Sequence, residues 1–144
     1  MRMRKTAHVQ PTFPVGHVVV VAGAAEELVE LARRLVDAGS IVALVHPTSR
    51  CDTAAASVRA DPTDVAVWDR VLPHVEQRLG PIDAVVTDEA AAATVGAVAV
   101  PELRRRGRGD AVVLGPGETA GELLNRLRDR PPATPAPPGP AGPG

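Results

Sequence analysis

The sequence has no tyrosine, and its only lysine is Lys5. A reaction that needs a tyrosine phenol, or a lysine within the folded part of the chain, is therefore excluded. The single cysteine, Cys51, excludes an internal disulfide framework and a zinc site made of cysteines alone. Phe13 and Trp68 are the only aromatic residues, too few for a surface on which the bases of single-stranded nucleic acid could stack.

A large excess of one charge sign is also lacking. The 16 basic and 17 acidic residues give a net charge of −1, which does not favour binding to nucleic acid. The four histidines share no motif with metal-ligand spacing, so no metal site is expected. No apolar run approaches the ~18 residues of a membrane-spanning helix, and residues 1–14 do not resemble a signal peptide. We therefore expect a cytoplasmic protein that does not bind membranes.

Composition divides the 144 residues into three parts. Residues 1–14 are mixed in character and carry two prolines, which is typical of a flexible arm. Residues 131–144 hold nearly half of the 15 prolines, so a disordered Pro/Gly-rich tail is expected there. Residues 15–130 form a single predicted domain that is long enough to bury a core.

Apolar runs alternate with helical patterns along this domain. The runs, each typical of a buried strand, are 17–22, 41–45, 55–60, 82–87 and 110–114. The helical patterns are 26–38, 64–79, 90–106 and 121–130. Pro73 is expected to kink or split the second helix, and Gly96 and Pro101 interrupt the third. Strands separated by helix-sized connections predict an α/β fold with a mostly parallel sheet.

The turn after the first strand, Gly23-Ala24-Ala25, is where a doubly wound sheet would hold a ligand. A dinucleotide fingerprint would place two more glycines in this turn. Glu26 and Glu27 lie where the helix N-terminus would receive a phosphate, and each carboxylate near a diphosphate would cost about 1–4 kcal/mol. The two carboxylates are expected to satisfy the helix dipole themselves. The residues alone thus favour a turn without a ligand.

Three segments, in their order and spacing, resemble the short-chain dehydrogenase/reductase (SDR) family over about residues 16–115. Arg59–Asp64 (RADPTD) resembles the stretch after the third strand of the family. Leu79–Val86 (LGPIDAVV) resembles the entry to its fourth strand, and Arg104–Val113 (RRRGRGDAVV) the entry to its fifth. The resemblance implies a Rossmann-like three-layer sandwich, with about five parallel strands in the order 3-2-1-4-5 and helices on both faces.

The departures from the family concern its chemistry. The Gly-rich turn would end near Leu28–Glu30, and the family's Asn-Asn-Ala-Gly stretch is matched only by Thr87–Ala90. The catalytic serine would fall in Leu114–Gly117, and the Tyr-x-x-x-Lys pair has no counterpart. Without that pair, hydride transfer to a carbonyl lacks its proton donor. The resemblance therefore implies a shortened, degenerate member with no catalytic residues.

Association is the role that we expect of such a module. A sheet that ends at a fifth strand exposes an edge, which invites a homodimer or another protein partner. The alternative is an oxidoreductase-family protein that still binds NAD(P), with or without a residual redox role in a larger complex.

If a dinucleotide binds, the resemblance implies a site built from Gly23, Ala24, Ala25, His46, Arg50, Asp61, Pro62 and Thr87. Asp61 stands where the family contacts adenine, although a turn or a helix cap is an equal alternative. His46 and Arg50 suit a 2′-phosphate better than ribose hydroxyls, so NADP is slightly favoured over NAD. The cofactor expectation is therefore either none or weakly bound NAD(P). A solvent-facing turn is the alternative for His46.

Asp88 supports a third hypothesis. It follows the fourth strand, as the phospho-acceptor does in response-regulator receivers. That chemistry also needs an acidic pair after the first strand to hold Mg²⁺ and a lysine late in the sheet. Ala22 and Gly23 stand where the pair would be, and the lysine is missing. We therefore rank this phospho-switch below the SDR resemblance.

Overall fold

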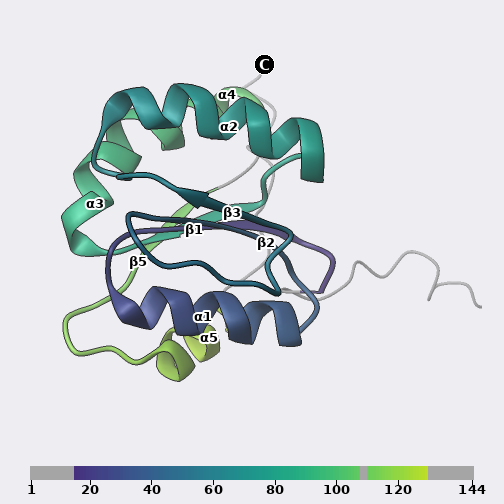
Figure 1. Cartoon of the computed structure of the whole chain (residues 1–144), viewed down its shortest axis with the longest axis vertical. Helices are drawn as coiled ribbons and strands as arrows, with labels where there is room; N and C mark the ends of the chain where they lie inside the picture. Colours follow the sequence, from purple (N-terminus) through teal and green to yellow (C-terminus); the bar gives the residue numbers. More distant parts are fainter. Residues whose placement is uncertain (1–14, 108–109, 130–144) are drawn as a thin grey trace, which may run out of the picture.

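The computed structural model describes residues 15–107 and 110–129 (Figure 1). Five strands form one parallel sheet in the order β3-β2-β1-β4-β5. The strands are β1 (Val18–Ala22), β2 (Ile41–His46), β3 (Ala56–Arg59), β4 (Ala84–Thr87) and β5 (Ala111–Val113). The predicted fold class and strand order are confirmed. The predicted arm (1–14) and tail (131–144) lie outside the described residues.

Helices cover both faces of the sheet. They are α1 (Glu26–Asp37), α2 (Val65–Leu79), α3 (Glu89–Thr94), the π-helical segment η2 (Val95–Ala99), α4 (Val100–Arg105) and α5 (Ala120–Arg128). In Figure 1, α1 and α5 lie on one face, and α2, α3 and α4 lie on the other. Each face has its own apolar core, because alternate residues of a strand point to opposite faces.

The central strand β1 has the composition of a strand buried on both faces. Val19 and Val21 face the α1 and α5 layer, whereas Val18 and Val20 face the α2–α4 layer. All four side chains are at most 5% exposed. Full burial of one such side chain contributes about 1.5–3 kcal/mol. The apolar runs of the sequence were therefore a reliable signal for the middle of the sheet.

The helix α2 continues through Pro73 and is not split. Asp64 begins the helix by accepting a hydrogen bond from Ala66 N–H at 2.9 Å. Pro73 lies on the exposed side of the helix, where water can solvate the carbonyl that its ring leaves without a donor. Buried side chains before and after the proline, including Trp68 and Val75, hold the helix on the sheet.

The predicted third helix is helical throughout, but its middle is a π-helical segment. Gly96 lies within η2, and Pro101 lies in the first turn of α4. Ala91, Val95, Ala99 and Leu103 are at most 1% exposed and pack in the same apolar core. No helix among the described residues is long and apolar enough to cross a membrane.

The two edges of the sheet differ. At β5, the Arg126 guanidinium donates a hydrogen bond to the Val113 carbonyl at 2.6 Å and is held by Glu118 at 2.9 Å. At β3, the strand has one strand neighbour, β2, and its residues are partly or fully exposed. A side chain of α5 therefore occupies one backbone carbonyl at the β5 edge, and the described residues make no such contact at β3.

Candidate functional site

The Asp88 carboxylate is bound to the turn between β1 and α1. Its Oδ2 accepts hydrogen bonds from the backbone N–H groups of Ala24 at 2.9 Å and Ala25 at 3.0 Å. Its Oδ1 accepts one from Ala91 N–H at 3.0 Å, which begins α3. The side chain is 8% exposed. Both carboxylate oxygens are thus engaged, and one of them uses the donors with which such a turn could bind an anion.

Gly23 is what permits the carboxylate to come this close. The residue is buried, and a Cβ atom built on it would lie 2.5 Å from Asp88 Oδ2 and 2.4 Å from Leu28 Cδ1. Both separations are shorter than those found between a real Cβ and its neighbours. The glycine at this position therefore makes room for a side chain of the same chain.

His46 fixes the same turn from the end of β2. Its Nε2 lies 3.2 Å from the Ala24 carbonyl, and its Nδ1 accepts hydrogen bonds from Thr48 N–H at 3.1 Å and Ser49 N–H at 2.8 Å. An Nδ1 that accepts from two N–H groups carries no proton, so Nε2 is the donor to Ala24. The ring is 2% exposed. The alternative of a solvent-facing turn is wrong, because the ring packs inward to satisfy backbone groups.

Thr87, the last residue of β4, is fully buried. Its backbone carbonyl accepts a hydrogen bond from Leu114 N–H at 2.7 Å. Its Oγ1 has no hydrogen-bond partner among the described residues. Gly23, Ala24, Ala25, His46 and Thr87 thus all lie at the carboxyl ends of β1, β2 and β4.

The carboxylates expected to satisfy the α1 dipole behave differently from one another. Glu27 Oε1 accepts a hydrogen bond from Ala120 N–H at 2.7 Å, at the first residue of α5. Glu26 remains exposed in the first turn of α1. Glu27 also lies in the first turn of α1, and the packing of α1 against α5 brings the N-terminus of a second helix within its reach.

Asp61 and Pro62 lie in the connection from β3 to α2. The Thr63 hydroxyl and backbone N–H donate to Asp61 Oδ1 at 2.7 and 2.9 Å, and these bonds lower the pKa of Asp61 below its ordinary value. Pro62 is buried, and its carbonyl accepts a hydrogen bond from Trp68 Nε1 at 2.9 Å. This arrangement is the turn alternative that the sequence left open for Asp61, because the cap of α2 is Asp64.

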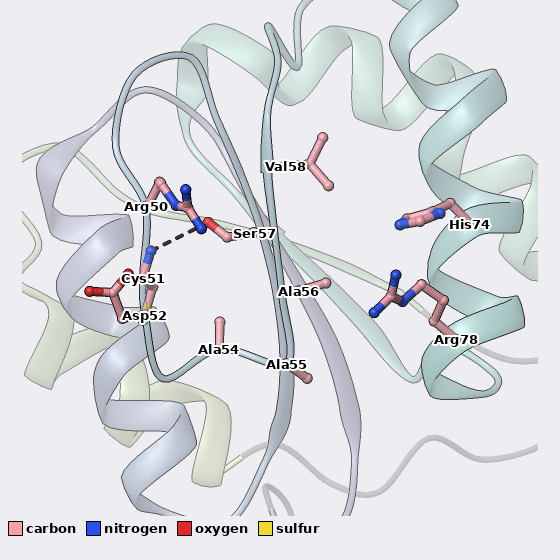
Figure 2. A pocket seen from close by; sticks show the side chains of 10 residues that line it. All are labelled: Arg50, Cys51, Asp52, Ala54, Ala55, Ala56, Ser57, Val58, His74 and Arg78. Carbon is pink, nitrogen blue, oxygen red and sulfur yellow. Dashed lines mark hydrogen bonds between the residues drawn. The ribbon is translucent and has the colours of Figure 1, made fainter.

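Arg50 lies at the β3 edge. It lines a pocket of about 300 Å³ that runs along β3, between the loop 50–55 and α2 (Figure 2). His74 and Arg78 of α2 line the opposite wall. The predicted site residues therefore occupy three places: the β1–α1 turn with its neighbours, the β3–α2 connection and the β3 edge.

A dinucleotide does not fit the β1–α1 turn as it stands. The Ala24 and Ala25 donors that would receive a phosphate already bind Asp88. A diphosphate in the same place would face that carboxylate at close range, and repulsion between two such charges at 4 Å is about 4 kcal/mol near a protein surface. No group of three potential metal ligands is present in residues 15–107 and 110–129 to offset the charge.

Comparison with known proteins finds likeness in structure. No protein-family profile and no curated protein sequence matches the chain. A short-chain dehydrogenase from Leptospira borgpetersenii, solved with bound NAD⁺, aligns over 70% of this chain and 52% of its own, with a TM-score of 0.59 and 11% identity. The chain therefore has an SDR-like Rossmann fold.

Two further SDR structures come from Serratia marcescens. A double variant aligns over 51% of this chain and 35% of its own, at 25% identity and a TM-score of 0.43. The enzyme without those substitutions aligns over 50% and 34%, at 21% identity and a TM-score of 0.41. The SDR-like chain thus spans between about a third and a half of the length of these proteins.

The sequence did not reveal the bonds that define this site. Asp88 was a candidate phospho-acceptor and a mismatch to the family pattern, not a ligand of the β1–α1 turn. One signal was available, because an aspartate directly before Glu89 and an alanine run is typical of a helix N-cap. The bonds to Ala24 and Ala25 join residues 64 and 63 positions apart, and no local pattern predicts them.

Proposed function

We propose that this SDR-like chain is a non-catalytic module that acts by associating with a protein partner and holds no dinucleotide in its β1–α1 turn. The observation that carries the proposal is the Asp88 carboxylate on the N–H groups of Ala24 and Ala25. Hydrogen bonds to a charged group contribute about 1.5–3 kcal/mol each, and they are made within the chain before any ligand arrives. A phosphate must therefore compete with a group that is tethered in place.

The contrast between the two sheet edges supports association as the role. Arg126, held by Glu118, occupies the Val113 carbonyl at the β5 edge, whereas among the described residues no side chain does so at β3, which lies beside a pocket. An uncovered strand presents backbone donors and acceptors that another chain can pair with. A partner at β3 would use groups that the fold leaves available.

The test for the cofactor is a fluorescence titration. Trp68 is the only tryptophan, so energy transfer from its indole to a reduced nicotinamide reports binding directly. The full chain is titrated with NADH and NADPH to millimolar concentration, with free tryptophan amide as the control for absorption of the exciting light. For both NADH and NADPH, we expect the titration of the chain to coincide with that of free tryptophan amide. A saturable loss of Trp68 emission beyond the control would overturn the proposal and favour retained NAD(P) binding.

The receiver-like alternative has no observation in its favour. Both oxygens of Asp88 accept backbone hydrogen bonds, and the part of the chain that the structure describes has no metal-ligand cluster beside them. Incubation with acetyl phosphate and Mg²⁺ is expected to give equal labelling of the native chain and Asp88→Asn. Labelling that disappears in Asp88→Asn would establish a phospho-switch instead.

A further inference from the structure

The pocket beside β3 has the backbone of an edge strand as its floor. Four consecutive residues, Ala55 to Val58, line it. In Figure 2, Ala56 and Val58 point toward α2, and Ser57 points toward the loop that carries Arg50. The cavity is therefore a groove along the strand, with one wall on each face of the sheet.

Backbone groups of β3 are available in this groove. The N–H of Ala60 donates to the His46 carbonyl of β2 at 3.1 Å. Because successive residues of a strand present their backbone groups to alternate sides, the backbone N–H and carbonyl groups of Val58 and Ala56 also face β2. The N–H and carbonyl groups of Ser57 and Arg59 then face away from the sheet, where an added strand would pair with them.

Positive charge lies on both walls. Arg50 stands on the loop wall, and His74 and Arg78 stand one helical turn apart on α2. Within the described ranges, neither arginine side chain has a hydrogen-bond or ion-pair partner, unlike Arg106 and Arg126, which are paired with carboxylates. Asp52 is the acidic residue of the lining, and its carboxylate points away from β3 in Figure 2.

These charges decide between occupants of the edge. In a symmetric dimer built by pairing β3 with β3, each groove would receive the Arg50 and Arg78 of the other copy, and like charges across paired strands are destabilising. A strand that carries carboxylates on both of its faces would instead meet unpaired guanidinium groups on both walls. Guanidinium–carboxylate pairs are the stronger class of hydrogen bond.

We infer that the β3 edge binds an acidic, extended segment of a partner protein as an added strand, with Arg50 and Arg78 as its specificity-determining residues. This inference rests on the proposed function and names the class of partner. Pairing with Ser57 and Arg59 supplies backbone hydrogen bonds that any sequence can make. The two arginines supply the preference for an acidic sequence, so affinity and selectivity have separate origins.

The experiment measures fluorescence anisotropy of labelled hexapeptides with the full chain. The acidic probe is Val-Glu-Glu-Glu-Glu-Val, and the neutral probe has glutamine in place of glutamate. A third probe is the acidic peptide with N-methyl groups on its four glutamates, which cannot donate backbone hydrogen bonds from either side. We expect the acidic peptide to bind, and the other two to bind at least about tenfold more weakly. The neutral peptide lacks the charge-assisted contacts, and the N-methylated peptide lacks the backbone donors that an added strand needs.

Matched variants test the two arginines. Arg50→Gln/Arg78→Gln removes two unpaired cations from the groove. Arg104→Gln/Arg128→Gln removes the same charge from two exposed sites on α4 and α5. We expect the first variant to lose binding of the acidic peptide about tenfold and the second to retain it, because screened charges away from the groove contribute little. Equal losses in the two variants would reduce the effect to net charge and overturn the inference.

The outcomes separate this inference from the proposed function. If the neutral peptide binds as tightly as the acidic one, the acidic partner is refuted. The same holds if the chain sediments as a dimer that the acidic peptide does not dissociate. Both outcomes leave association as the proposed function intact. Equal binding of the N-methylated peptide would refute strand addition. A monomeric chain that binds none of the peptides and binds NADH would refute the proposed function itself.

Discussion

The β1–α1 turn and the β3 edge are both places where an SDR-like sheet offers backbone hydrogen bonds, and this chain treats them in opposite ways. At the turn, the donors of Ala24 and Ala25 are used by Asp88. At the edge, the groups of β3 lie in a groove beside two arginines, Arg50 and Arg78, that have no partner in the part of the chain that the structure describes. The comparison teaches that a fold can lose one binding place by filling it with its own side chain while another stays accessible.

The largest expected effect follows from emptying the turn. Asp88→Ala leaves three backbone donors without their acceptor, so we expect a loss of about 3 kcal/mol in the free energy of unfolding. Urea denaturation followed by circular dichroism measures it. Asp52→Ala, at the open edge, is the matched control and should change stability by less than about 0.5 kcal/mol. Similar losses in both variants would contradict the contrast between the two places.

The next effect tests how tightly the turn is filled. Gly23→Ala places a methyl group against Asp88 and Leu28, and we expect it to cost about 2 kcal/mol. In an Asp88→Ala background the same substitution should cost less, because one of the two obstacles is gone. A double-mutant cycle measured in urea gives the coupling. Additive losses would indicate that the methyl group contacts only Leu28.

A smaller effect concerns the covered β5 edge. Arg126 is about half-exposed, so Arg126→Ala should cost about 1 kcal/mol or less. It also uncovers the Val113 carbonyl, so we expect self-association at high concentration in analytical ultracentrifugation. The neighbouring exposed residue provides the control, Arg128→Ala, which should remain monomeric. A monomeric Arg126→Ala chain would mean that this contact does not protect the edge.

The smallest effect is a pH dependence at the same edge. Hydrogen bonds from Arg126 hold the pKa of Glu118 below its ordinary value in the folded chain. A lowered pKa stabilises the fold above the ordinary value of about 4.3. This stabilisation disappears as the pH falls through the lowered pKa. The free energy of unfolding, measured between neutral pH and about pH 3, should fall less steeply at acidic pH in Glu118→Gln than in the native chain. The same pH dependence in both would show that Glu118 makes no net contribution to stability.

The sequence predicted the sheet better than the site, for a physical reason. Each central strand is apolar on both faces, so β1, β2 and β4 are visible as local runs. The site depends on contacts between distant residues, such as Glu27 with Ala120 and Asp88 with Ala24. Local patterns carry no information about which donors a carboxylate will reach.

His46 and Arg50 illustrate the same limit at short range. His46 ends β2 and Arg50 lies four residues later, and both were predicted to contact the 2′-phosphate of a bound dinucleotide. The chain turns at residues 47–49, and two N–H groups of that turn bind the His46 ring. His46 therefore points into the fold, and Arg50 lies beyond the turn at the β3 edge. The side chains of His46 and Arg50 are therefore separated although the residues are close in sequence, because the His46 ring binds the turn at residues 47–49 that lies between them.

The π-helical segment η2 has a consequence for how the chain tolerates a change of length. Ala91, Val95, Ala99 and Leu103 recur every four residues, and four residues of a regular α-helix overshoot a full turn by about 40°. A wider turn at Val95–Ala99 absorbs that surplus and keeps the four side chains in one line. Deleting one residue there would return the segment to a regular α-helix. The deletion removes about 100° of rotation, which is close to what the wider turn takes up, so Leu103 would keep its direction toward the core. The irregular turn thus lets this helix hold one residue more than a regular α-helix with the same buried face.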